Sequence, residues 1–142
     1  MERSSSRKHL AVVLIFLALV LFPLASCISS SASAYLDAGA SNLTATGAQF
    51  AQNWLIRFDT SSTQRTLFTP SAADIVKNLQ SPSVGEVVII AVTADGANTV
   101  TIQGGTGVIV KPSASTIAAD TTLTLYCVLT SVISGSEGVT IY

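Results

Sequence analysis

The chain has 142 residues, of which 49% are hydrophobic and only 11% are charged, with a formal net charge of −1. This length suits one domain rather than two full cores, and the apolar, nearly neutral composition excludes intrinsic disorder. Seven Lys and Arg against eight Asp and Glu supply no basic surface for a phosphate backbone, so we expect no nucleic-acid partner. Two cysteines are too few for a disulfide scaffold.

The histidine content bears directly on catalysis. The only histidine is His9, which lies in the basic N-terminal segment formed by residues 1–9. The rest of the chain therefore has no imidazole for a Ser-His-Asp or Cys-His nucleophile and none for a metal site. We expect a non-enzymatic protein with no catalytic residue, no cofactor and no metal ion.

Residues 10–28 form an apolar segment that predicts a retained membrane anchor. Its 19 residues are just long enough to cross a hydrocarbon core of about 30 Å. The positive charges before it favour the cytoplasmic side for residues 1–9. The side chains expected to contact lipid are large and apolar, namely Leu10, Val12, Leu14, Phe16, Leu19, Leu21 and Phe22.

Two other interpretations of this segment stay open. Residues 32–34, Ala-Ser-Ala, fit a signal-peptidase site, although the apolar run is longer than the 7–15 residues that are typical of a signal peptide. Residues 24–27, Leu-Ala-Ser-Cys, match a bacterial lipobox, in which Cys27 is acylated; Cys27 is also a candidate for juxtamembrane palmitoylation. Residues 29–34 form a small Ser/Ala linker in each case.

From residue 35 to residue 142 the sequence predicts one mainly β domain. Strands are expected at residues 54–58, 86–93, 99–103, 108–110, 122–130 and 139–142. Short strands separated by Gly and Asn turns indicate an antiparallel jelly-roll-like sandwich. The Gly-rich run at residues 104–107 is expected to be a hairpin turn.

Side-chain alternation predicts which faces of these strands are buried. In residues 122–130, Leu123, Leu125, Cys127 and Leu129 share one face, so that Cys127 is expected to be a buried thiol without chemistry. In residues 54–58, Trp54, Ile56 and Phe58 share a face. Residues 86–93 are apolar on both faces, which is typical of a strand that is buried on both sides.

One short helix is expected within residues 66–80. Pro70 suits its first turn, and Ser71 with Asp74 resembles a capping box. Apolar residues then recur at helical spacing, at Ala72, Ile75, Val76 and Leu79.

An ordered series of motifs in residues 54–142, about 100 of the 142 residues when the preceding segment is included, resembles a known family. In order these are Leu55-Ile56-Arg57-Phe58-Asp59, Phe68-Thr69-Pro70-Ser71-Ala72-Ala73-Asp74-Ile75-Val76, Val84-Gly85, Asn98-Thr99-Val100-Thr101, Gly105-Thr106-Gly107-Val108, Thr116-Ile117-Ala118 and Gly135-Ser136-Glu137-Gly138-Val139-Thr140-Ile141-Tyr142, with Asn42-Leu43-Thr44-Ala45 before them. The series is similar to a small jelly-roll-like domain that recurs in minor capsid, decoration and spike proteins of large DNA viruses and tailed phages. The apolar N-terminal segment is not part of that shared domain.

The resemblance implies a virion structural protein: a membrane-anchored minor capsid component that packs its β domain against the capsid shell. Its partners would be major capsid jelly-rolls or further copies of itself, as in a trimer, together with a lipid membrane through residues 10–28. The alternative from the N-terminal signals is a bacterial surface lipoprotein, or a secreted adhesin or filament subunit, at the cell surface.

Few polar residues stand out as candidate sites. Arg57 and Asp59 are carried by the family resemblance, and we expect them to form a structural ion pair or an inter-subunit contact. Asn42 begins the sequon Asn-Leu-Thr and is a candidate glycosylation site in a secretory lumen. Asp59, Asp95 and Asp120 are spread along the sequence and are not expected to bind calcium.

Overall fold

The computed structural model describes residues 35–52 and 55–142. Within them the chain is mainly β, with two short α-helices and one turn of 3₁₀-helix. In chain order the elements are β1 (Tyr35–Gly39), β2 (Leu43–Thr44), α2 (Gly47–Gln52), β3 (Leu55–Asp59), β4 (Arg65–Phe68), α3 (Ala72–Lys77), β5 (Val87–Asp95), β6 (Val100–Gln103), β7 (Val108–Val110), η1 (Pro112–Ala114), β8 (Thr116–Ile117), β9 (Thr121–Ser131) and β10 (Gly138–Ile141).

The strands form two sheets, and both are mixed. The six-stranded sheet has the order β1-β3-β5-β9-β10-β7, and the four-stranded sheet has the order β2-β4-β6-β8. Five pairings between described strands are parallel and three are antiparallel. The expected antiparallel arrangement is therefore wrong for most pairs, and the structure confirms only the coarser prediction of a mainly β chain.

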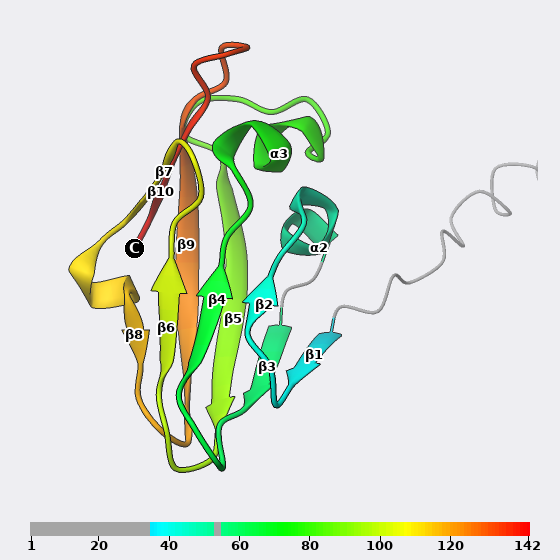
Figure 1. Ribbon diagram of the computed structural model, residues 1–142. Helices are drawn as coiled ribbons and strands as arrows, with labels where there is room; N and C mark the ends of the chain where they lie inside the picture. The colour runs from blue at the N-terminus through cyan, green and yellow to red at the C-terminus, as the bar shows by residue number, and fades with distance from the viewer. Residues whose placement is uncertain (1–34, 53–54) are drawn as a thin grey trace, which may run out of the picture. The chain divides into compact units, whose positions relative to one another are not determined.

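The parallel pairs follow from how the first three strand pairs are connected. β1, β3 and β5 lie in the six-stranded sheet, and each is followed by a turn into the four-stranded sheet, at β2, β4 and β6 (Figure 1). The chain then returns to the first sheet past α2 or α3, so each new strand starts from the same end as the last. Such a crossover makes neighbouring strands parallel.

Side chains at the turns join each strand pair to the next one along the sheets. Asn42 Oδ1 accepts a hydrogen bond from the Thr66 amide at 2.9 Å, and Asn98 Nδ2 donates to the Thr60 carbonyl at 2.8 Å. Gly96 packs directly against the neighbouring turn, since a Cβ built on it would lie 2.5 Å from the Ser61 amide nitrogen. With φ at +132°, this position favours glycine on backbone grounds as well.

The core lies between the sheets and is closed at one end by the two helices. Both sheets contribute fully buried aliphatic and aromatic side chains, and Phe50 of α2 and Ile75 of α3 are also fully buried. The predicted alternation in β9 is confirmed, because Leu125, Cys127 and Leu129 are fully buried. Ile56 and Phe58 point inward as expected, whereas Trp54 lies outside the described residues.

The helices differ from the sequence prediction in number and in start. α3 begins at Ala72 with Ser71 as its N-cap, so Pro70 precedes the helix instead of occupying its first turn. The Ser71–Asp74 capping interaction is confirmed: the Asp74 amide donates to Ser71 Oγ at 3.1 Å. Helix α2 was not expected, although Thr46 and Gln49 cap it in the same way.

The glycine-rich run at residues 104–107 also has a different role from the one expected. It carries the chain from β6 in the four-stranded sheet to β7 in the six-stranded sheet, so it is a crossing between sheets and not a hairpin turn. β7 then pairs in parallel with β10, at the opposite margin from β1.

Candidate functional site

Strand β5 presents apolar side chains on both faces, but only one face is covered by described residues. Ile90 and Val92 point into the core and are fully buried, whereas Val87 and Ile89 point outward and are 45% and 54% exposed. The expectation that this strand is buried on both sides is therefore wrong for the described domain. An outward apolar row on a central strand is unusual, because a sheet face in contact with water normally carries polar side chains.

Neighbouring strands extend this exposed row into a patch. Across the sheet, Ile89 lies opposite Tyr126 of β9, and Tyr126 exchanges two backbone hydrogen bonds of 3.1 Å with Tyr142. Six outward side chains in the sheet or directly after it are large, hydrophobic and more than two-fifths exposed. We call them the apolar patch: Tyr35, Val87, Ile89, Ile109, Tyr126 and Tyr142.

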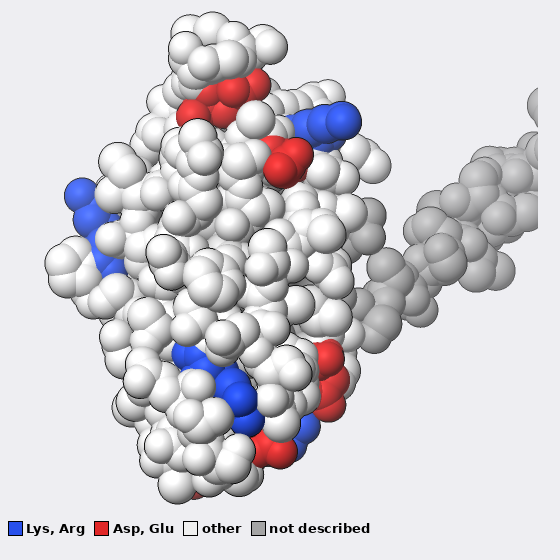
Figure 2. Space-filling view, viewed as in Figure 1, with Lys and Arg blue, Asp and Glu red and all other residues white. Residues whose placement is uncertain are grey.

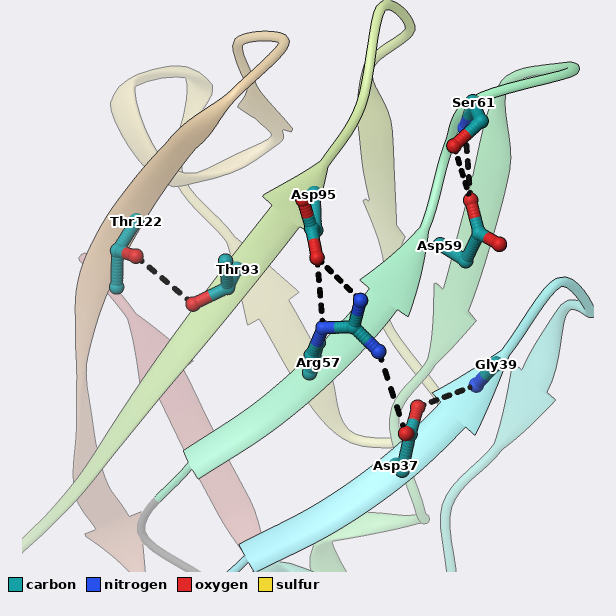
Figure 3. Close-up of polar contacts among 8 residues, drawn as sticks. All are labelled: Asp37, Gly39, Arg57, Asp59, Ser61, Thr93, Asp95 and Thr122. Atoms are coloured by element: carbon teal, nitrogen blue, oxygen red, sulfur yellow. Dashed lines mark hydrogen bonds and ion pairs between the residues drawn. The ribbon is translucent and has the colours of Figure 1, made fainter.

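A cluster of charged groups lies on the same outward face and spans β1, β3 and β5. Arg57 of β3 lies between Asp37 of β1 and Asp95 of β5 (Figure 3). Its Nε donates to Asp95 Oδ2 at 2.8 Å and its Nη1 to Asp37 Oδ2 at 3.3 Å, and its Nη2 also pairs with Asp95. The bonds to Asp95, with smaller contributions from Tyr35 and Asp37, raise the pKa of the Arg57 guanidinium above its ordinary value.

The partners of Arg57 differ from the one that the sequence suggested. Asp59 accepts hydrogen bonds from the Ser61 amide at 2.9 Å and from Ser61 Oγ at 2.6 Å, in the turn that follows β3 (Figure 3). These bonds, helped by the charges of Arg57 and Arg65, lower the pKa of the Asp59 carboxyl. Asp59 therefore shapes a turn, and the expected ion pair between Arg57 and Asp59 is replaced by pairs with Asp37 and Asp95.

A single cation borders the patch on the β7 side. Lys111 follows β7 directly, is exposed, and places its Nζ 5.9 Å from the centre of the Tyr142 ring. That distance is within the range of a cation–π contact. Two carboxylates against one guanidinium leave a formal charge of −1 at the cluster of Asp37, Arg57 and Asp95, which extends from the β1 edge as far as β5.

The outer face of the four-stranded sheet is of another chemical kind. Thr66, Thr101 and Thr116 lie opposite one another across β4, β6 and β8, and Gln64 Nε2 donates to Thr101 Oγ1 at 2.6 Å. Figure 2, viewed from this side, shows charged groups at the ends and margins of the molecule and almost none over the middle. This face is covered by hydroxyl groups, while the apolar patch belongs to the six-stranded sheet.

Few described groups offer nucleophilic or metal chemistry. Cys127 is free and fully buried, and desolvation raises the pKa of its thiol to about 12, which leaves it protonated and inert. Among residues 35–52 and 55–142, no group of three or more His, Cys, Asp and Glu is placed to hold a metal ion. Asn42 is exposed and its Oδ1 holds the start of β4; its glycosylation stays a prediction.

A shallow hollow of about 500 Å³ lies where the two helices begin. Thr46, Ser71, Asp74 and Asn78 are among its lining residues, and Asp74 is the only charged one. The Asp74 carboxylate accepts a hydrogen bond from Ser71 Oγ at 2.9 Å. The polar groups of the hollow are therefore already used in capping α2 and α3, and they do not converge on a ligand.

The predicted anchor at residues 10–28, including Cys27, lies outside the residues that the structure describes. Within the described part of the chain, no helix has the length and apolar character that crossing a bilayer requires. Comparisons with protein-family models, with curated proteins and with solved structures gave no match for this chain.

Proposed function

We propose that this protein is a structural component of a virus particle, a membrane-anchored minor capsid protein whose two-sheet β domain packs against protein neighbours at the capsid shell. The apolar patch is the observation that supports this proposal most directly. An exposed patch of six large apolar side chains is typical of surfaces that bind other proteins. Residues 10–28 supply the membrane anchor, and residues 29–34 link it to the domain.

The low content of charged residues suits a domain that is packed against other proteins. Ordinary soluble domains carry about 25% charged residues over the whole chain, whereas only 11% of this chain is charged. A protein that is packed in a shell and held at a membrane has less need of a charged surface. Its polar groups, chiefly Ser and Thr hydroxyls, are equally suited to contacts with other proteins.

The test is to fractionate the native source into particles and cells and to measure the intact mass of the protein in each. The proposal predicts a mass near the full 14.6 kDa, found with the particles and released by detergent. A protein lacking residues 1–34 and found free outside cells would contradict it. A protein lacking residues 1–26 with a diacylglycerol adduct on Cys27 would instead establish a bacterial surface lipoprotein.

A further inference from the structure

We infer that the neighbour covering the apolar patch is a second copy of this chain, packed face to face about a two-fold axis that runs parallel to the strands between β5 and β9. This inference deepens the proposed function, and only the argument from anchoring depends on it. Three observations support it: the area of the patch, the pairing of nearby charges within one copy and the direction of the strands.

The exposed area matches what a stable pair needs. From the exposed fractions of its six side chains, the patch leaves on the order of 600 Å² open to solvent, at the areas usual for aromatic and aliphatic residues. Two copies packed through it would bury about 1,200 Å² from these residues alone, which is the lower bound for specific and stable interfaces. Two sheets with apolar inner faces pack about 10 Å apart, with their strands within about 30°.

Most charged groups on this face are already paired within one copy. Arg57 bonds both Asp37 and Asp95 across β1, β3 and β5, and Lys111 lies over the Tyr142 ring at the β7 side. The side chains of Val87, Ile89 and Tyr126 themselves carry no charge to desolvate, which avoids the main cost of burying a polar surface.

The strand direction selects this axis over one perpendicular to the strands. An axis parallel to the strands leaves both copies of β1 starting from the same end of the pair, whereas a perpendicular axis places them at opposite ends. Because residues 1–34 precede Tyr35 in the chain, starting from one end is what anchoring both copies in a single membrane requires. The same arrangement turns the two hydroxyl-rich faces outward, where they are free to contact the shell.

Cross-linking through a single introduced thiol tests the arrangement. Thr124 is exposed on β9, next to the inferred axis, and Thr116 is exposed on β8 of the other sheet. Cys27→Ser removes the N-terminal thiol, and Cys127 is buried and unreactive. We would place Thr124→Cys or Thr116→Cys in this full-length background, reconstitute each protein in dilute phosphatidylcholine vesicles, and add a bis-maleimide with a span of about 10 Å, the distance between packed sheets.

The inference predicts covalent dimers for Thr124→Cys and none above background for the matched Thr116→Cys. Adding Ile89→Lys to Thr124→Cys should lower the dimer yield about tenfold or more, since it buries an unpaired charge at the centre of the pair. Adding Ile133→Lys, the same change at a side chain that is 69% exposed outside the sheet, should leave the yield unchanged.

Equal yields from the two cysteine positions would overturn the inference, and so would the absence of covalent dimers from Thr124→Cys. The comparison of the two cysteine variants decides the matter even if Ile89→Lys does not fold. The outcome is also independent of where the protein resides in its source. A failed dimer with a correct particle location therefore removes only this inference, and a dimer with the wrong location removes only the proposed function.

Discussion

Helices α2 and α3 approach each other through Gly47. Helix propensity alone predicts that Gly47→Ala stabilises the protein, whereas this contact predicts that it destabilises the protein. Replacing a helical glycine by alanine usually stabilises a helix, by up to about 1 kcal/mol. The backbone at Gly47 is not among those in the left-handed region, so alanine fits it locally. A Cβ at this position, however, would lie 2.2 Å from the carbonyl oxygen of Asp74 and 2.7 Å from Asn78 Nδ2.

The size of the effect follows from the movement that this overlap forces. Real Cβ atoms essentially never come closer than 3.0 Å to such an atom, so α2 must shift from α3 by about 0.8 Å. A gap of 0.5–1 Å costs roughly a quarter to a half of each packing contact, and α2 carries the fully buried Phe50. Overpacking of this kind costs about 1–3 kcal/mol. After the gain in propensity, we expect Gly47→Ala to lose about 1–2 kcal/mol.

The measurement is thermal unfolding of full-length Gly47→Ala and wild type by circular dichroism. For a domain of this size the expected fall in Tm is about 5–10 °C. Adding Asn78→Ala should not restore stability, because the closest atom belongs to the Asp74 backbone. Ala73→Gly, an exposed change in α3 that affects propensity alone, serves as the control and should cost no more than about 1 kcal/mol. A Tm for Gly47→Ala at or above the wild-type value would refute the reasoning.

Three further predictions follow from individual polar groups. The lowered pKa of Asp59 contributes stability that is fully present above about pH 4, the pKa of an unfolded Asp, and that is lost as the pH falls through the folded pKa. Urea unfolding should therefore show wild type more stable than Asp59→Asn at pH 7, with a difference that shrinks below pH 4 and vanishes below the folded pKa. A difference that is constant with pH would contradict this. Thr60 is fully buried, and its Oγ1 has no hydrogen-bond partner among the described residues. Thr60→Val should therefore leave the free energy of unfolding unchanged or raise it by up to about 1 kcal/mol. A clear loss of stability would contradict this, because it would show that the hydroxyl is bonded. Burial raises the pKa of the Cys127 thiol to about 12. In a Cys27→Ser background this thiol should therefore react with a disulfide reagent at pH 8 only as the domain unfolds. Rapid labelling of the native protein would contradict this, because it would show that the thiol is accessible.

Strands with a strong local signal could be predicted from the sequence. The alternation of β9 is long enough to define both its buried and its exposed face, and the Ser71–Asp74 pattern locates the start of α3 within two residues. Strands β2 and β8 have two residues each, which is too short for any period to emerge. α2 was missed because it begins with glycine and Phe50 is its only large apolar residue, so that no helical spacing of apolar residues emerges, although the Thr46–Gln49 capping box was visible in the sequence.

Strand direction and side-chain partners depend on contacts that no local pattern contains. Parallel pairing of β3 with β1 and β5 follows from the repeated crossing between sheets, and it places Arg57 beside residues that are 20 and 38 positions away in sequence. The proximity of Asp59 in sequence was therefore a poor guide to the partner of Arg57. The apolar character of β5 was predicted correctly, but the prediction of burial on both sides was wrong, because apolar side chains alone do not show whether another element covers the outer face.

The central claim is that the apolar patch is covered in the assembled protein, and hydroxyl-radical footprinting tests it most directly. The protein would be oxidised in its native assembly and again after dissociation in mild detergent, and Ile89, Tyr126 and Ile133 would be compared by tandem mass spectrometry. All three are about half exposed or more in the single chain. The account predicts that assembly protects Ile89 and Tyr126 several-fold and leaves Ile133 unchanged. Equal oxidation of Ile89 and Tyr126 in both states would contradict it.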